Sequence, residues 1–261
     1  MDRADNVPIV DVLLPVRAPA PWLDQALDSI VGQQMSGWRL LLVMDGYSAD
    51  VQNVIDELPP LTAKRVEVLP EGSGLVAALN HGLSVSHAQF IARLDADDVC
   101  RPERLSRQVA YMSEQANCVA LGTGVEHSDE HGDVLGIRGP SKPGTLVGKL
   151  RWRCPIAHPT AMIRRESIVE VGGYRAVARH AEDFDLWLRL AAKGEIHAIP
   201  EVLLSYRLHG NQVTSGLKFP RVTRRAVLES RLALADARGE SRLAARTRHA
   251  TWQAVNRIKG R

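Results

Sequence analysis

The sequence predicts an α/β fold with an open, mostly parallel sheet that carries helices on both faces. Over about the first 115 residues, apolar segments of strand length alternate with segments whose apolar residues recur at helical spacing. The loops between these segments are short, and such alternation is typical of parallel strands joined by helices. The segment 89–94 is apolar enough to be a central strand of this sheet.

Four strands and four helices make up the predicted first half. The first strand stops at Pro15, and Pro21 stands where the first residue of a helix is expected. Ser48 is placed to cap a helix, and Gly72-Ser73-Gly74 is too short for a phosphate-binding loop, so we expect a turn there. We expect strands over 9–15, 39–44, 66–69 and 89–94, and helices over 21–31, 48–58, 75–83 and 102–112.

The second half has a different character. Residues 126–136 are polar and rich in turn formers, which predicts an exposed hairpin after a strand over 118–125. Gly172-Gly173-Tyr174 reads as a turn after a short helix, and an amphipathic helix is expected over 184–190. The remaining expected strands lie at the end of 154–163 and over 196–199 and 202–208.

Three carboxylates follow the 89–94 strand within four positions: Asp95, Asp97 and Asp98. They would repel one another unless a cation, or a ligand carrying one, lay among them. Ligands of such sheets bind beyond the carboxyl ends of the strands, which places these acids on one rim with Asp45. The alternative is a helix cap, which needs only one Asp, and we expect Asp98 to cap the helix after Pro102.

The composition is that of an ordinary globular protein, with 45% hydrophobic and 24% charged residues among 261. Three cysteines are an odd number without metal-ligand spacing, which predicts reduced thiols and a cytoplasmic protein. There is no apolar run of about 18 residues to span a membrane. The polar, acidic residues 1–5 do not have the pattern of a signal peptide.

The carboxyl-terminal 44 residues are strongly basic. Twelve Lys and Arg against three acids give residues 218–261 a net charge of +9, whereas the whole chain carries +3. Apolar positions at helical spacing predict two helices broken near Gly239. Three roles stay open: contact with an anionic membrane surface, packing on the domain, or packing on a second subunit. Nucleic-acid binding is not expected, because no aromatic-interleaved basic motif accompanies the charge.

Taken together and in order, the motifs resemble family 2 inverting glycosyltransferases of GT-A fold, over about Val7 to Val213. The residues that carry the resemblance are Asp45-Gly46 after a strand, Ala92 to Asp98, His158-Pro159-Thr160, Gly172-Gly173-Tyr174, Glu182 to Arg189, and Tyr206 to His209. The resemblance implies a catalytic domain over 1–215, with a nucleotide-sugar half at about 1–115 and an acceptor half at about 116–215. A basic helical tail follows over 216–261.

The resemblance also implies roles for individual residues. Asp95 is expected beside the donor ribose, and Asp97 is expected to hold Mn²⁺ or Mg²⁺ on the donor diphosphate. Asp45 is expected to meet the donor base, although Met44 stands where relatives often have a second acid. Asp183 is expected to be the catalytic base, with Glu182 beside it.

Other assignments from the resemblance keep a structural alternative. His209 is a further metal ligand or a strand-end histidine in solvent, and Trp187 is an acceptor-side group or a core residue. His158 is an acceptor-side group or a structural loop histidine, and Glu182 is catalytic or only the acid favoured at a helix start. The remaining nucleotide-sugar contacts are expected from Pro15, Val16 and Arg207.

The chemistry of an inverting sugar transfer fits these residue types. A single displacement at the anomeric carbon needs a base for the acceptor hydroxyl and a cation for the departing diphosphate. We expect a UDP-sugar donor, with GDP- and dTDP-sugars open, and a glycan or lipid-linked acceptor. Two alternatives are a nucleotidyltransferase, which would need a basic glycine-rich loop after the first strand, and a non-catalytic binding module, which intact Asp97 and Asp183 disfavour.

Overall fold

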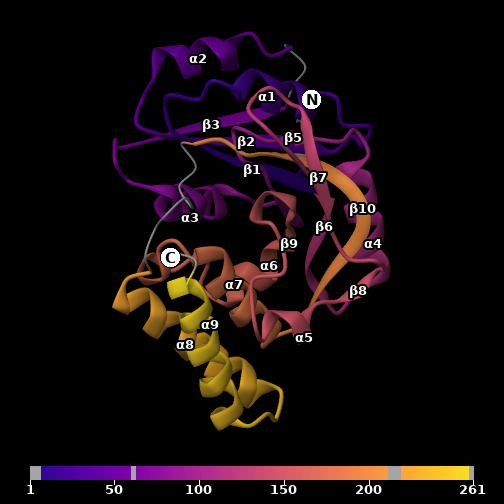
Figure 1. Ribbon diagram of the computed structural model, residues 1–261. Helices are drawn as coiled ribbons and strands as arrows, with labels where there is room; N and C mark the ends of the chain where they lie inside the picture. Colours follow the sequence, from indigo (N-terminus) through magenta and orange to yellow (C-terminus); the bar gives the residue numbers. More distant parts are fainter. Residues whose placement is uncertain (1–6, 60–62, 211–218, 259–261) are drawn as a thin grey trace.

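The computed structural model describes residues 7–59, 63–210 and 219–258 (Figure 1). Several predictions fall outside the described residues: the acidic start at 1–5, the domain boundary at 215/216, and Val213, Lys218, Lys259 and Arg261. The described residues form one ten-stranded sheet in the order β3-β2-β1-β4-β9-β6-β10-β5, with β7 beside β6 and β8 beside β10.

The first half is a parallel sheet. Its strands are β1 (Val10–Val16), β2 (Trp38–Asp45), β3 (Lys64–Leu69) and β4 (Phe90–Arg93). Helices α1 (Leu23–Val31), α2 (Ala49–Asp56), α3 (Leu75–Val85) and α4 (Arg104–Glu114) connect or follow them. Val12 lies opposite Leu40 on one side and Ala92 on the other, so the carboxyl ends of β1, β2 and β4 finish at the same edge.

Helices cover both faces of this sheet, as predicted. Along β1, Val12 and Leu14 pack in one hydrophobic core with residues of α1, whereas Leu13 packs in a second core with residues of α3. Neighbouring side chains of a strand point to opposite faces, so each strand can join both cores only if it is apolar throughout. This requirement explains the continuous apolar runs in the sequence.

The second half adds antiparallel strands to the sheet. β9 (Met162–Arg164) lies antiparallel between β4 and β6 (Cys118–Ser128), and β6 is parallel to β10 (Glu195–Arg207). Short strands complete the edges: β5 (Val99–Cys100), β7 (Val134–Arg138) and β8 (Gly144–Thr145). β6 and β7 form the predicted hairpin. β10 is continuous where two strands were predicted, with an irregular register between Ala198 and Val202.

Four short helical segments and one longer helix lie between these strands. The short segments are α5 (Val147–Leu150), η1 (His158–Thr160), α6 (Arg165–Glu170) and η2 (Ala176–Ala178). The longer helix is α7 (Glu182–Ala191), which begins with the two acids of the predicted catalytic pair. The predicted turn at 172–174 follows α6, with Gly172 and Gly173 at positive φ.

Of the two helix caps predicted from the sequence, one is present and the other is absent. The Ser48 hydroxyl accepts the amide of Val51 at 3.4 Å and caps α2 as predicted. The cap predicted for Asp98 is wrong, because α4 begins after Glu103 without a side-chain cap and β5 carries the chain away between them. The Asp98 carboxylate instead accepts the backbone amide of Arg207 on β10 at 3.0 Å.

The basic tail packs on its own domain as two helices, α8 (Arg221–Ala237) and α9 (Arg242–Ile258). They are broken where predicted, with Gly239 at a φ of 64°. Trp252 of α9 packs against the Phe184 ring at the start of α7, with 5.8 Å between ring centroids. Figure 1 shows the helix pair on the α7 side of the sheet.

A buried carboxylate joins α7 to α8. Asp185 is fully buried and accepts from Arg175 at 3.0 Å, from Arg189 at 2.9 Å and from the Ser230 hydroxyl of α8 at 2.8 Å. Arg175 also donates to the Ala226 carbonyl of α8 at 3.0 Å. This hydrogen-bonded charge cluster fixes the position of the tail on α7.

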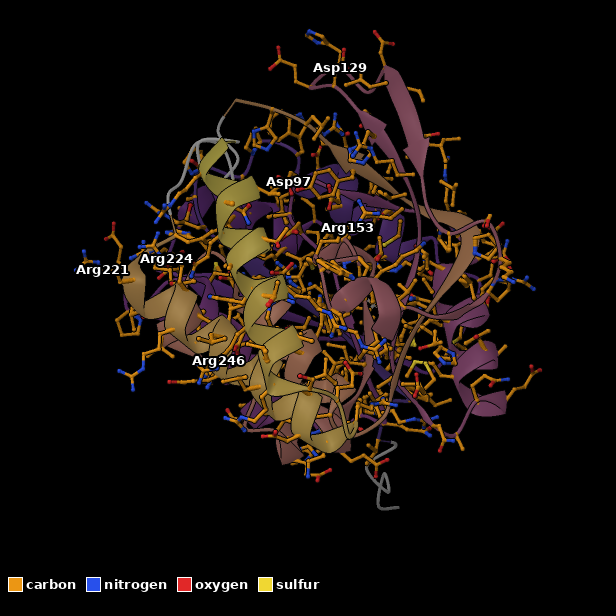
Figure 2. All side chains as sticks on the ribbon, turned by 60° about the horizontal axis from the view of Figure 1, so that its bottom comes forward. Asp97, Asp129, Arg153, Arg221, Arg224 and Arg246 are labelled. Atoms are coloured by element: carbon orange, nitrogen blue, oxygen red, sulfur yellow. The ribbon has the colours of Figure 1, made fainter. Side chains whose placement is uncertain are left out.

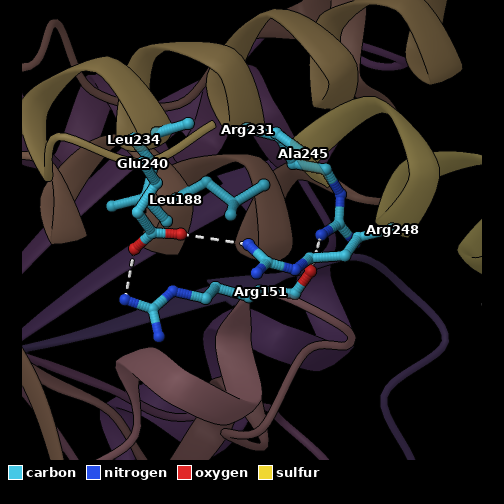
Figure 3. A pocket seen from close by; sticks show the side chains of 8 residues that line it. Arg151, Leu188, Arg231, Leu234, Glu240, Ala245 and Arg248 are labelled. Atoms are coloured by element: carbon cyan, nitrogen blue, oxygen red, sulfur yellow. Dashed lines mark hydrogen bonds and ion pairs between the residues drawn. The ribbon is translucent and has the colours of Figure 1, made fainter. Parts of the chain in front are cut away.

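Part of the tail's positive charge faces inward. Figure 3 shows Glu240 bridging Arg151, which follows α5, and Arg248 of α9. Arg231 is buried with its guanidinium over the Phe184 ring, and Arg238 donates to Glu195 at 2.6 Å. Arg221 and Arg246, in contrast, are exposed (Figure 2). No helix within the described ranges has the length and apolar character of a membrane span.

We predict that Asp185→Ala destabilises the protein by about 3–5 kcal/mol, because it leaves two arginines without their buried partner. Ser230→Ala should cost about 1 kcal/mol, since it removes one hydrogen bond to the cluster. Urea unfolding followed by circular dichroism measures both. Asp236→Asn on the exposed side of α8 is the control and should change the free energy of unfolding by less than about 0.5 kcal/mol. Equal effects of Asp185→Ala and Asp236→Asn would contradict the assignment.

Candidate functional site

Three carboxylates gather at the carboxyl end of β4. Asp95, Asp97 and Asp98 each place one oxygen so that all three lie within 4.8 Å of one another. The Asp98 amide donates to the Asp95 carbonyl at 3.3 Å, so a tight turn brings the three side chains together. Figure 2 shows Asp97 over the body of the domain and Asp129 at the projecting tip of the β6–β7 hairpin.

The electrostatics of this cluster are those of crowded acids, of which Asp98 is buried and the other two are partly exposed. Burial raises the pKa of Asp95, even though the buried guanidinium of Arg93 forms an ion pair with it. Burial and the charges of Asp95 and Asp97 raise the pKa of Asp98 well above its ordinary value. A divalent cation among the three oxygens would remove this penalty.

The residues present fit a hard divalent cation. Oδ2 of Asp98 is buried and has no hydrogen-bond partner among the described residues. His209 Nε2 lies 2.8 Å from Oδ2 of Asp97, and its side chain is only 10% exposed. The structure thus does not place His209 as a strand-end histidine in solvent. Carboxylate oxygens with one imidazole suit Mn²⁺ or Mg²⁺.

Arg207 of β10 makes several hydrogen bonds around the acidic turn. Its side chain is buried and donates to the Asp97 carbonyl at 3.2 Å, to the Glu130 carbonyl at 3.1 Å and to Gln25 at 2.7 Å. Its guanidinium also stacks over the Trp22 ring. The direct donor contact predicted for Arg207 stays a prediction. Arg207 holds the acidic turn in place from β10.

The other nucleotide-side residues lie at the ends of β1 and β2. Asp45 accepts the amides of Ser73 at 2.7 Å and Gly74 at 3.1 Å, so it also fixes the predicted turn before α3. Pro15 is half-buried, and the Val16 side chain is buried in the core of α1. Val16 can thus offer a ligand only its backbone.

Asp183 and Glu182 begin α7. Burial, and then the charge of Glu182, raise the pKa of Asp183 to about 6. One Asp183 oxygen accepts the Phe184 amide at 2.6 Å, and the other lies 3.5 Å from the Cys154 thiol. Glu182 has one buried oxygen without a partner in the described part of the chain.

Two tyrosines show that Asp183 and the acidic cluster share one space. Burial raises the pKa of Tyr206, and the charges of Asp95, Asp97, Asp98 and Asp183 raise it further. Burial likewise raises the pKa of Tyr174, with contributions from Asp183, Glu182 and Asp95. Both sets of acids therefore act on the Tyr206 hydroxyl, because such charges are screened beyond short range.

The two residues predicted on the acceptor side are Trp187 and His158. Trp187 has no exposed surface, so the alternative of a core residue is correct and its ring is no platform for a sugar. His158 donates to or accepts from the Tyr174 hydroxyl at 2.8 Å, and its ring lies edge-on to Trp187. Burial and the nearby Arg93 hold the pKa of His158 well below its usual range, so it is neutral.

Sequence reasoning missed four residues of this site. Arg93 could have been found, because an arginine in an apolar strand before three acids needs an acidic partner. Tyr174 and Tyr206 lie inside the motifs, but nothing local shows that both face the acids. Cys154, interpreted as a plain thiol, carried no signal in its spacing.

Comparison with known proteins agrees with this geometry. The family model described as glycosyl transferase family 2 matches residues 11–173. The amylovoran biosynthesis glycosyltransferase AmsE of Erwinia amylovora is 31% identical over 193 residues, which cover 73% of this chain and 72% of that protein. An uncharacterized glycosyltransferase of Haemophilus influenzae is 29% identical over 198 residues, covering 74% and 73%.

Solved structures confirm the fold. TarS 1–349 of S. aureus, in complex with UDP-GlcNAc, superposes with a TM-score of 0.74 at 14% identity and covers 93% of this chain and 71% of that chain. The mannosyltransferase PcManGT of Pyrobaculum calidifontis, in complex with GDP-Man and Mn²⁺, has a TM-score of 0.60 at 20% identity and covers 95% and 80%. The resemblance seen in the motifs is thus confirmed, and the GT-A fold with it. The chain belongs to glycosyl transferase family 2 and is a glycosyltransferase.

Proposed function

We propose that this glycosyltransferase is metal-dependent and inverting, and that it transfers a sugar from a nucleoside-diphosphate sugar to a hydroxyl of a glycan or lipid-linked acceptor. One observation carries the proposal. Asp183, a carboxyl group whose pKa is raised to about 6, and the cluster of Asp95, Asp97 and Asp98 both raise the pKa of Tyr206 through their charges. A base and a cation site in one space are what a single displacement requires.

The donor side rests on the acid cluster and on the structural neighbours. Asp97 and His209, with Asp95 and Asp98 close by, would hold Mn²⁺ or Mg²⁺, which when bound would neutralise charge on the departing diphosphate. Asp95 would meet the ribose and Asp45 the base. The neighbours were solved with UDP-GlcNAc and with GDP-Man, and we favour a UDP-sugar because the TarS structure superposes better.

The acceptor side rests on Asp183. Its carboxylate would take the proton of the acceptor hydroxyl as the oxygen attacks the anomeric carbon from the face opposite the diphosphate. Burial, and then the charge of Glu182, raise the pKa of Asp183 to about 6, which suits this task. Relatives named for amylovoran and O-antigen biosynthesis support an acceptor that is a growing surface glycan. Peripheral membrane contact, a cytoplasmic location and homo-oligomerisation stay predictions.

We predict that Asp97→Ala weakens donor binding in the presence of Mn²⁺ by roughly 10–100-fold, as for the loss of other metal-site groups. Titration calorimetry with UDP-sugars, with and without Mn²⁺, measures the effect. Asp129→Ala at the exposed hairpin tip removes a carboxylate outside the cluster and should bind like the wild type. Unchanged Mn²⁺-dependent binding by Asp97→Ala would overturn the metal assignment.

Asp183→Asn should bind donor like the wild type but turn over roughly 10²–10⁴-fold more slowly, because the amide cannot accept the proton. Release of nucleoside diphosphate from a panel of UDP-, GDP- and dTDP-sugars gives both the donor and the effect. Full activity in Asp183→Asn would remove this residue from the mechanism.

The same substitution should stabilise the fold in a pH-dependent way. The folded-state pKa of Asp183 is raised to about 6, so its stabilising contribution is complete at low pH and is lost as the pH rises through 6. Asp183→Asn should therefore be more stable than the wild type by about 1–2 kcal/mol at alkaline pH, with no difference near about pH 4. Thermal unfolding across this range is the measurement, and an equal difference at all pH values would exclude the ionisation as its cause.

A further inference from the structure

The thiol of Cys154 lies against the proposed catalytic base. Cys154 follows α5 in the loop that leads to His158, and its Sγ is 3.5 Å from Oδ2 of Asp183. The same sulfur is 3.4 Å from the backbone carbonyl of Ile156. A thiol has one proton, so these two acceptors compete for it.

We propose that Cys154 is a positioning residue for Asp183: its S–H donates a hydrogen bond to the ionised carboxylate and turns to the Ile156 carbonyl once Asp183 is protonated. The proposal rests on the proposed role of Asp183. It gives the ionised base a hydrogen-bond donor without a fixed cation beside it, and it leaves the thiol with an acceptor once the base is protonated.

The groups around Asp183 explain why the thiol is its hydrogen-bond donor. Its Oδ1 is held by the Phe184 amide at 2.6 Å, so Oδ2 is the oxygen that can take a proton. The charged and titratable groups that act with it are Glu182 on the same helix, Tyr174 after α6 and Tyr206 on β10. None of these is a cation, and Cys154 is the one side chain among the described residues that donates a hydrogen bond to Asp183.

The thiol remains protonated throughout. Burial, and then the neighbouring charge of Asp183, raise the pKa of Cys154 well above its ordinary value. Thiolate chemistry is therefore not expected of Cys154, because the thiolate and not the thiol is the nucleophile. Cys154 acts as a hydrogen-bond donor only.

The proton balance of the step follows. The O–H bond of the acceptor breaks, its proton forms a bond to Oδ2 of Asp183, and the freed electron pair forms the new bond to the anomeric carbon. The bond from that carbon to the diphosphate breaks, and the diphosphate leaves with its electron pair. Cys154 neither gains nor loses a proton, since its S–H only turns from Asp183 to the Ile156 carbonyl.

The test is the pH profile of kcat in three variants. Cys154→Ala removes the donor that favours the ionised carboxylate, so the acidic limb should move upward by about half a pH unit to one pH unit. Cys154→Ser keeps a donor and should keep the limb at or below its wild-type position. Cys118→Ala removes a buried thiol of β6 that has no hydrogen bond to Asp183, and it controls for loss of core packing.

The outcomes separate this proposal from the proposed function. An inactive Asp183→Asn together with an unmoved limb in Cys154→Ala would overturn the role of Cys154 and leave the base in place. An active Asp183→Asn would overturn the base itself. Equal shifts in Cys154→Ala and Cys118→Ala would also reject the positioning role. If Cys154→Ala does not fold, Cys154→Ser and Cys154→Val, which is close in size and lacks a donor, carry the same comparison.

Discussion

The ion pair between Arg93 and Asp95 is the interaction on which the site depends. Arg93 ends β4 with a side chain that is 1% exposed, and it supplies the cation nearest to three crowded acids. Its own carbonyl accepts a hydrogen bond from the buried Arg104 at 2.7 Å. The acidic turn is thus held from within the domain, while Arg207 holds it from β10. A cation-binding cluster can fold in the absence of its metal only if fixed charges of this kind offset the repulsion.

Local pattern predicted most of the fold and about half of the site. The rim shared by Asp45 and Asp95 follows from parallel strands that end at one edge, so it could be predicted from order alone. The contact between Asp98 and Arg207 could not be predicted, since it joins positions 109 residues apart. Trp187 lies on a helical stripe that the sequence cannot assign to the core or to the cleft, because both are apolar.

The tail shows a different limit of sequence reasoning. The net charge of the tail suggests that its arginines lie at the surface. Several of them instead face the domain, where they donate to backbone carbonyls, pair with Glu195 or lie over an aromatic ring. An arginine has a long apolar stem and a planar head that stacks, so it can be buried where a count of charges places it in solvent. Charge alone did not indicate which arginines these would be.

Asp183 and Asp185 lie two residues apart on α7, so the proposed base and the residue that binds the tail belong to the same helical turn. Asp183 is the proposed base, and Asp185 accepts a hydrogen bond from Ser230 of α8, so a shift of the tail would reach the proposed base through about half a turn of helix. Exchange of tails between relatives would consequently alter turnover. Chimeras of this family should therefore be joined before α7, with its helix and tail inherited as one piece.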